Sequence, residues 1–282
     1  MSDKQHILLV DDDPNISHLV RLYLEKEGFG VTESARGDDA LTAFEAAASI
    51  GRNWARKEDP PEMLPPLRKG SGERVLSEHE AKQLLKQHGL AVPEGIVCRA
   101  VDAVAAAEKL GFPVTLKVSS AAIAHKTEAG GVALNLRNAA EVEEAASRMR
   151  QLAPEVLVER MVRGAVAELI IGVKRDPQFG LALVIGAGGV LTELLRDSVA
   201  LLLPTSRAEI ERAVKRLRVW TLVEGFRGKS GDARAVVDAI ETVANFASSY
   251  AGSLEELDVN PLLVLPDGAC AVDALIRMRP LA

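Results

Sequence analysis

A glycine-rich strand end limits the possible folds of this chain more than any other stretch of its sequence. Residues 182–197 read ALVIGAGGVLTELLRD, so an apolar strand runs into Gly186, Gly188 and Gly189. Glycines carry no side chain, and backbone amides can therefore approach a phosphate closely at such a turn. The stretch predicts a buried strand that ends in a phosphate-binding loop.

Two short strands near the end of the sequence carry oxygen ligands. Residues 256–274 read ELDVNPLLVLPDGACAVDA, which predicts a hairpin turning at Pro266-Asp267-Gly268. Asp258, Asn260 and Asp273 offer the hard oxygen atoms that magnesium prefers. A phosphate loop together with magnesium ligands indicates a site that uses a nucleotide.

The composition is that of a globular protein with a sizeable core. The chain has 282 residues, of which 48% are hydrophobic and 26% are charged. Its net charge of -6 argues against nucleic acid as a partner. Cys98 and Cys270 lack metal-ligand spacing and suit a reducing compartment. We find no signal peptide and no apolar run of membrane-spanning length, so we expect a cytoplasmic protein.

Three zones follow one another along the chain. Residues 1–47 read as strand, helix, strand and helix, beginning with HILLV. Residues 48–74 contain four prolines and mixed charges without periodicity, which is typical of a linker. Residues 75–282 become regular again and predict the main domain.

Helix-start signals and apolar runs alternate in the main domain. Capping-box patterns occur at Ser77 with Glu80, Asn138 with Glu141, and Ser206 with Glu209. We expect helices over residues 78–88, 103–110, 139–151, 207–217 and 232–250. β-rich runs lie between them, and their hairpin-like order favours a mixed sheet over a purely parallel one. The pattern predicts an α/β or α+β protein.

Polar residues placed on apolar strands or in loops are further site candidates. Lys117 closes the apolar strand FPVTLKV, where it suits a phosphate counter-charge or simply reaches solvent. His125 lies in a loop of small residues, where it is a phosphoryl acceptor, a base or an ordinary surface histidine. Glu168 lies inside an apolar strand, where it faces outward or binds a ligand hydroxyl.

Residues 75–278 contain eight motifs in a fixed order. With these motifs, this part of the chain resembles the ATP-grasp part of NDP-forming acyl-CoA synthetases of the ADP-forming acetate–CoA ligase type. That type is distantly akin to the succinyl-CoA synthetase β subunit. The motifs are LSEHEAKQLLKQHGLAVPE (76–94), FPVTLKVSS (112–120), IAHKTEAGGV (123–132), RDPQFG (175–180), GAGGVLTELLRD (186–197), GFRG (225–228), LDVNPL (257–262) and AVDA (271–274). Together they are far more specific than one glycine loop.

The resemblance implies an ATP-grasp fold in which two α+β lobes hold ATP between them. It implies that Lys117 contacts the phosphates and Glu168 the ribose. It also implies an adenine hinge, read mainly through its backbone, formed by Glu159, Arg160, Met161 and Val162. Gly186, Gly188 and Gly189 would lie along the phosphate path.

The same resemblance implies a magnesium-dependent phosphoryl relay. Asn260 and Asp273 match the family's magnesium ligands, and His125 matches a loop histidine that relays phosphate. Asp258 would orient the phosphohistidine, and Glu193 would lie along the phosphate path. The implied activity is that of an acid–thiol ligase component that uses ATP and Mg²⁺.

In this family CoA binding and the principal phosphohistidine belong to an α-type half with Rossmann-like domains. The sequence contains no GxGxxG after a strand and no second histidine loop. We therefore expect an α-type CoA-binding partner subunit, and so a hetero-oligomer, for full turnover.

Residues 1–47 resemble the start of a bacterial response-regulator receiver domain, a partial flavodoxin-like βαβα fragment. Asp11 and Asp12 match the acid pair of that family. The strand that would carry the phosphoacceptor aspartate is absent, because the sequence continues as GRNWARKEDPPEML. We expect a truncated segment without a phosphorylation switch.

Two other functions remain open from the sequence. One is a signalling module in which the receiver-like segment acts and the ATP-grasp body senses nucleotide. The other is an inactive scaffold that holds the α-type partner. Phosphate transfer from ATP to His125 would favour the enzyme, whereas label on Asp11 or Asp12 from a small phosphodonor would favour the signalling module.

Overall fold

The computed structural model describes residues 6–10, 21, 24–25, 29–34, 74–119, 130–176, 179–189 and 197–279. By its internal contacts the chain divides into two compact units. The first is Met1–Asp59 with Ala200–Leu202, and the second is Pro60–Val199 with Leu203–Ala282.

The first unit contains two parallel strands. β1 (His6–Val10) pairs with β2 (Gly30–Ser34) along their full length. The sequence predicted both strands, and parallel pairing is what a strand–helix–strand connection gives. Asp11 and Asp12 lie outside the described residues, so the receiver-like interpretation stays a prediction.

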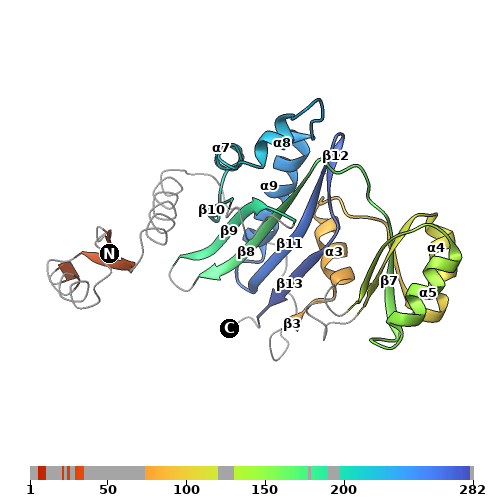
Figure 1. Cartoon of the computed structure of the whole chain (residues 1–282). Helices are drawn as coiled ribbons and strands as arrows, with labels where there is room; N and C mark the ends of the chain where they lie inside the picture. Colours follow the sequence, from red (N-terminus) through yellow and green to blue (C-terminus); the bar gives the residue numbers. More distant parts are fainter. Residues whose placement is uncertain are drawn as a thin grey trace. The chain divides into compact units, whose positions relative to one another are not determined.

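The second unit contains a small lobe, residues 95–160, in which two helices pack on a four-stranded sheet (Figure 1). The strand order is β4-β7-β5-β6, and the pairings are antiparallel. Its elements are β4 (Gly95–Arg99), η1 (Ala100–Asp102), α4 (Ala103–Leu110), β5 (Val114–Val118), β6 (Val132–Leu136), α5 (Ala139–Met149) and β7 (Glu155–Arg160).

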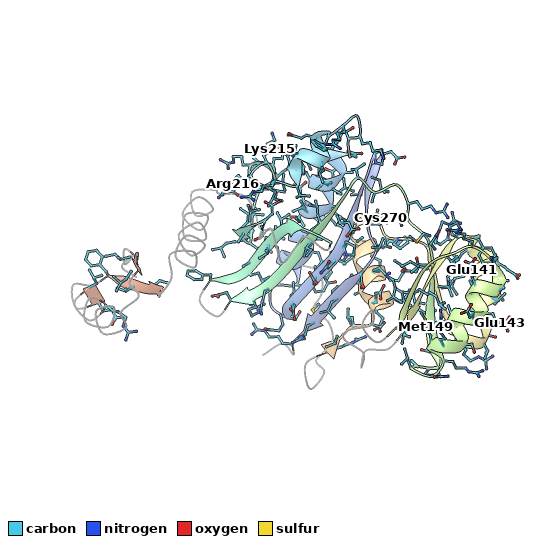
Figure 2. All side chains as sticks on the ribbon, viewed as in Figure 1. Glu141, Glu143, Met149, Lys215, Arg216 and Cys270 are labelled. Carbon is cyan, nitrogen blue, oxygen red and sulfur yellow. The ribbon has the colours of Figure 1, made fainter. Side chains whose placement is uncertain are left out.

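The helices of the small lobe bury one stripe each. Val142, Ala145, Ala146 and Met149 of α5 are buried at helical spacing, whereas Glu143 is exposed on the outer side (Figure 2). The predicted helix began correctly at 139 but ended at 149 rather than 151.

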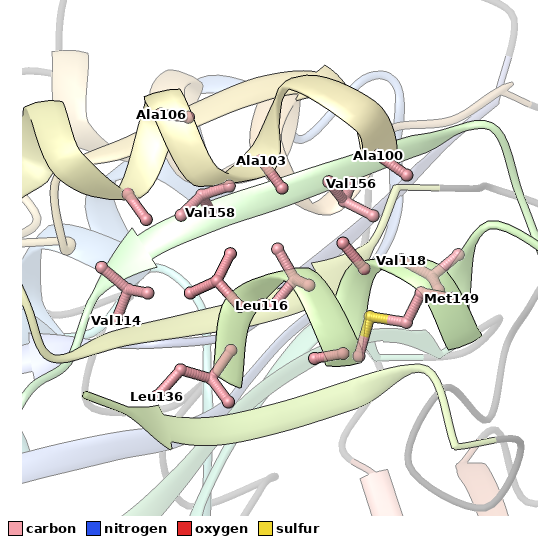
Figure 3. Close-up of a cluster of buried hydrophobic side chains, with 14 of the residues drawn as sticks. Ala100, Ala103, Ala106, Val114, Leu116, Val118, Leu136, Met149, Val156 and Val158 are labelled. Carbon is pink, nitrogen blue, oxygen red and sulfur yellow. The ribbon is translucent and has the colours of Figure 1, made fainter. Parts of the chain in front are cut away.

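Strand β5 is buried on both faces, which matters for the site. Val114, Leu116 and Val118 alternate along it and face the helices in the core of the small lobe (Figure 3). The residues between them therefore point to the opposite face, and Thr115 and Lys117 are nevertheless buried there. That second face needs polar partners.

The rest of the second unit is a large lobe whose strands belong to a seven-stranded sheet of order β10-β9-β8-β11-β13-β3, with β12 paired to β11. Its strands are β3 (Arg74–Val75), β8 (Ala167–Asp176), β9 (Gly180–Ala187), β10 (Ser198–Leu202), β11 (Leu254–Leu265), β12 (Gly268–Ala271) and β13 (Ala274–Met278). Its helices are α3 (Glu78–Gln87), α7 (Arg207–Val214), α8 (Trp220–Glu224) and α9 (Ala233–Ser249). Of the edge strand β10, only Ser198 and Val199 belong to this unit.

The hairpin predicted near the C-terminal end is present. β11 and β12 pair antiparallel with Leu265 opposite Gly268, so the chain turns at the predicted residues. β11 also pairs antiparallel with β8 and with β13, which makes it the centre of the large sheet. Helix α9 packs against β8, β9, β11 and β12 and covers their apolar side (Figure 1).

The helix-start signals were accurate, and the largest error is at the end of α7. Ser77 and Ser206 form complete capping boxes, and the Asn138 side chain accepts from the Glu141 amide. The helix predicted over 207–217 ends at Val214, and the short helix α8 follows it. The two α+β lobes agree with the predicted fold class.

Candidate active site

Helix α3 carries two charged residues on its buried face. Glu78, Ala81, Lys82 and Leu85 are buried at helical spacing, and only 1% of Lys82 is exposed. The Ser77 capping box fixes where this helix begins, so Glu78 lies in its first turn. Buried charges need partners, and these two residues find them on the small lobe.

Lys117 of β5 reaches across to α3 and to the large sheet. Its Nζ lies 2.6 Å from Glu78 Oε1 and 3.2 Å from Glu159 Oε2. The same Nζ donates to the carbonyl oxygen of Val272 at 2.6 Å. Lys117 therefore does not reach out to solvent in this structure, and it joins the small lobe to the segment between β12 and β13.

Lys82 contacts the same three residues as Lys117, through a different carboxylate oxygen of Glu159. Its Nζ lies 2.8 Å from Glu78 Oε1, contacts Glu159 Oε1, and donates to the Val272 carbonyl at 3.1 Å. We call Glu78, Lys82, Lys117 and Glu159 the buried ion cluster. It contains two cations and two anions, and it ties both lobes together.

The carboxylates around Lys117 keep it charged. Burial favours the neutral amine, but Glu78, Glu159 and Asp273 outweigh burial and raise the pKa of Lys117 above its ordinary value. Lys117 is thus a cation held in place, which is the form that a phosphate counter-charge requires.

The predicted oxygen ligands gather beside this cluster. Val259 on β11 lies opposite Ala274 on β13, so Asp258, Asn260 and Asp273 lie at neighbouring positions of the two strands. The Asn260 backbone amide donates to the Asp273 carbonyl at 3.3 Å. Since Lys117 binds the carbonyl of the residue before Asp273, its ammonium lies near the predicted magnesium ligands.

Asp258 is partly buried and lies near two other carboxylates, Asp273 and Glu256. Burial raises its pKa to about 6, with further contributions from Asp273 and Glu256, and a side-chain hydrogen bond with Asn260 opposes the rise. The ionised carboxylate is therefore disfavoured in the folded chain.

We expect Asp258→Asn to stabilise the metal-free chain at pH 7.5 by ~1 to 2 kcal/mol, allowing for solvent screening of a half-buried group. The pKa of Asp258 is about 6 in the folded chain and 3.8 as a reference, so its ionised form opposes folding above pH 6. The gain should be complete above that pH and disappear as the pH falls towards 3.8. Urea unfolding in a chelating buffer at pH 7.5 and pH 4 measures it.

Glu143→Gln, at an exposed carboxylate of α5, is the control and should change little at either pH. A loss of stability on Asp258→Asn at pH 7.5, or an equal gain at both pH values, would contradict this account of the Asp258 environment.

The predicted hinge divides into a buried side chain and backbone contacts. The Glu159 side chain belongs to the ion cluster, and only 3% of the residue is exposed. The amides of Arg160 and Met161 donate to the carbonyls of Glu94 and Pro113. Val162 follows them and is half-buried. The hinge is therefore anchored on both sides before any ligand binds.

The predicted phosphate-loop glycines pack tightly against Glu168. Gly188 donates to the Glu168 carbonyl at 2.7 Å, and a Cβ at Gly188 would lie 3.0 Å from the Glu168 carbonyl carbon. Gly189 has a φ of +77°, and a Cβ there would lie 3.0 Å from Glu168 Oε2. A Cβ at Gly186 would lie 3.1 Å from the Asp197 carbonyl oxygen. Close packing thus requires these glycines, whether or not they also face a phosphate.

Two predicted catalytic residues, His125 and Glu193, lie outside the described residues. Glu168, the predicted ribose contact, is exposed on β8. This position agrees with both expectations for Glu168, a side chain that faces outward and one that binds a ligand hydroxyl. Where the chain is described, no group of three or more His, Cys, Asp or Glu residues is placed to hold a metal ion.

Two residues of the ion cluster, Glu78 and Lys82, were not expected from the sequence. Their signal was present, because two charged residues occupy positions 78 and 82 of an otherwise apolar helix face that continues at 81 and 85. Cys270, labelled in Figure 2, was also not recognised as a residue that interacts electrostatically with Lys82 and Glu159. Burial raises its pKa to about 11, which Lys82 opposes and Glu159 assists.

Comparison with known proteins matches this same part of the chain. A family model described as an ATP-grasp domain covers residues 68–278. The chain belongs to the ATP-grasp family. The match includes both lobes of the second unit, so the ATP-grasp fold predicted from the motifs is confirmed.

The ATP-grasp chain has relatives among acetate–CoA ligases. It is 34% identical over 221 residues to the acetate–CoA ligase (ADP-forming) II subunit beta of Pyrococcus furiosus, which covers 74% of this chain and 93% of that subunit. It is 37% identical over 205 residues to the acetate–CoA ligase (ADP-forming) II of Archaeoglobus fulgidus, which covers 72% of this chain and 30% of that protein. It therefore spans most of a separate beta subunit and about a third of a longer relative.

A solved structure gives the same result. The acetyl-coenzyme A synthetase 1 of Candidatus Korarchaeum cryptofilum, in complex with coenzyme A and Mg-AMPPCP, matches the ATP-grasp chain with a TM-score of 0.65 and 36% identity. The match covers 73% of this chain and 93% of that one. These relatives are named as ligases and synthetases, which favours the enzyme over the signalling interpretation. None of the described helices is long and apolar enough to cross a membrane.

Proposed function

We propose that this chain is the nucleotide-binding, phosphoryl-transferring component of an ADP-forming acyl-CoA ligase of the acetate–CoA ligase type. The observation that carries the proposal is the 2.6 Å contact between Lys117 Nζ and the Val272 carbonyl, next to Asp273. Through it, a buried cation of the small lobe meets the oxygen ligands of the large lobe. A triphosphate with its metal ion needs both.

The nucleotide would lie along the residues that surround this contact. Lys117 supplies the positive charge for the phosphates, and the anchored segment from Glu159 to Val162 reads the base through its backbone. Glu168 is an exposed acid at the large-lobe side and would bind a ribose hydroxyl. Gly188 and Gly189 pack against Glu168, which supports a phosphate path beside the ribose contact.

Asn260 and Asp273 would hold Mg²⁺. One carboxylate and one amide oxygen, completed by substrate phosphates, fit this ion. When bound, Mg²⁺ neutralises charge that develops on the transferred phosphoryl group. A similar solved structure was obtained with Mg-AMPPCP, which supports the assignment.

His125 would accept the phosphoryl group. Its unprotonated imidazole nitrogen attacks the γ-phosphorus, a P–N bond forms, the bond to the β–γ bridging oxygen breaks, and ADP leaves. Lys117 neutralises negative charge on the phosphates during this step. Asp258 would orient the imidazole, and Glu193 would lie along the same path.

Full turnover would require an α-type subunit that binds CoA and carries the principal phosphohistidine. The match of this chain covers 93% of a relative named subunit beta, and it covers about a third of a longer relative. Both matches support a division of labour between an ATP-grasp component and a second part. The assembly would be a hetero-oligomer.

We propose residues 1–47 as a separate, truncated receiver-like segment followed by a linker over 48–74. The parallel pairing of β1 and β2 supports a strand–helix–strand unit in this segment. The family match begins at residue 68, which supports placing the ATP-grasp domain after the linker.

Titration of the full chain with Mg–ATP, followed by mass spectrometry of the product, tests the proposed function. We expect one-to-one binding and one added phosphoryl group on His125. An absence of ATP binding would contradict the nucleotide site. Tight binding without any phosphoryl transfer, even with the α-type partner present, would instead support the inactive scaffold.

A further inference from the structure

Two lysines in the buried ion cluster compete for the same acceptors. Lys82 and Lys117 both contact Glu78 Oε1, a carboxylate oxygen of Glu159 and the Val272 carbonyl. The two ammonium groups come from different lobes, Lys82 from α3 and Lys117 from β5. Such duplication is not needed to satisfy the carboxylates, because each already has a partner in Lys82.

A phosphate-binding role for Lys117 creates a problem that Lys82 solves. To reach a phosphate, the Lys117 ammonium must give up at least part of its contact with Glu78 and Glu159. Those carboxylates are 7% and 3% exposed as residues, and a buried carboxylate without a partner is strongly disfavoured. Lys82 is 1% exposed and already lies on both carboxylates.

We propose that Lys82 is a positioning residue that keeps Glu78, Glu159 and the Val272 carbonyl satisfied while Lys117 moves to the nucleotide phosphates. The inference rests on the proposed nucleotide site and adds a residue to it. Lys82 would contact neither the nucleotide nor the metal ion. Lys82 would determine how easily the Lys117 ammonium leaves Glu78 and Glu159.

This role differs from that of a simple tether between the lobes. Loss of a tether would weaken the binding of every ligand held by the two lobes to the same extent, because both lobes would loosen. A residue that releases Lys117 affects only the part of the affinity that comes from phosphates. Adenosine and ATP share the base and ribose but differ in the phosphates, so comparing the two ligands separates the roles.

Lys82→Met removes the second ammonium while keeping a buried side chain of similar length. Lys117 then remains as the one lysine of the buried ion cluster, opposite Glu78 and Glu159. We expect ATP affinity to fall about tenfold and adenosine affinity to stay within twofold. Calorimetric titration of the full chain with ATP and with adenosine measures both. Lys86→Met, at an exposed lysine one turn further along α3, is the matched control and should change neither.

Restoring the charge balance should restore ATP binding. In Lys82→Met with Glu78→Gln, one ammonium faces one carboxylate, and we expect most of the lost ATP affinity to return. Glu78→Gln alone keeps both lysines and loosens the hold on Lys117, so ATP should bind about threefold tighter. This single variant decides the matter if Lys82→Met does not fold.

Three results would overturn the proposal: equal losses for ATP and adenosine, no recovery in the double variant, or weaker ATP binding by Glu78→Gln. The wild-type chain separates this failure from failure of the proposed function. If the wild type binds Mg–ATP and the variants behave otherwise than expected, only the role of Lys82 is wrong. If the wild type binds no ATP, the nucleotide site itself is wrong.

Discussion

Lys117→Met lowers the rate at which Mg–ATP phosphorylates this chain by about a hundredfold to a thousandfold. The ammonium of Lys117 is buried, remains charged, and lies beside Asp273, so water cannot easily replace it. A lysine that is already charged can neutralise developing phosphate charge without first taking up a proton. Rapid-quench measurement of phosphoryl transfer from labelled ATP determines the rate.

Two controls accompany this variant. Lys109→Met removes an exposed lysine of α4 and should leave the rate unchanged. A thermal unfolding curve shows whether the variant folds, because breaking a buried ion pair costs about 3 to 5 kcal/mol. Lys82 still neutralises Glu78 and Glu159, which should preserve the fold. A folded Lys117→Met chain with the wild-type rate would remove Lys117 from the phosphate site.

His125→Ala abolishes phosphorylation of the chain and its turnover with the α-type partner, while ATP affinity stays within about twofold. The imidazole nitrogen is the proposed acceptor, and no other group would take its place. Affinity depends instead on Lys117, the hinge and the metal ligands. Mass spectrometry after incubation with Mg–ATP, with calorimetry on the same samples, checks both parts.

His79→Ala is the matched control, because His79 is a half-buried histidine of α3 away from the glycine loop in the sequence. It should be phosphorylated on His125 as the wild type is. Full partner-dependent turnover by the His125→Ala chain would show that phosphate does not pass through His125.

Local signals in the sequence were sufficient for most of the fold. The capping residues Ser77 and Ser206 mark helix starts because their hydrogen bonds lie within one turn. The turn at 266–268 marks a hairpin for the same reason, since the paired strands β11 and β12 lie directly on either side of it. The end of α7 was missed because helix ends depend on tertiary packing more than on propensity.

The contacts of the site could not be predicted, because they join residues that are distant in the sequence. Lys117 was recognised as a candidate, but its partners Glu78 and Glu159 are distant in the chain and meet only when both lobes form. Glu159 was assigned to a hinge read through its backbone, and its side chain instead belongs to the ion cluster. Gly188 was assigned to phosphate approach, and its closest constraint is the Glu168 backbone. Motif resemblance located these residues without giving their contacts.

The proposed function requires one triphosphate to contact both Lys117 and the ligands Asn260 and Asp273. The most direct test is calorimetric titration of ATP, with and without Mg²⁺, into the wild type, Lys117→Met and Asp273→Asn. We expect Mg²⁺ to tighten ATP binding in the wild type, Asp273→Asn to lose that tightening, and Lys117→Met to weaken binding in both conditions. Undiminished ATP affinity in Lys117→Met, alongside a Mg²⁺ effect that depends on Asp273, would place the two groups around different ligands.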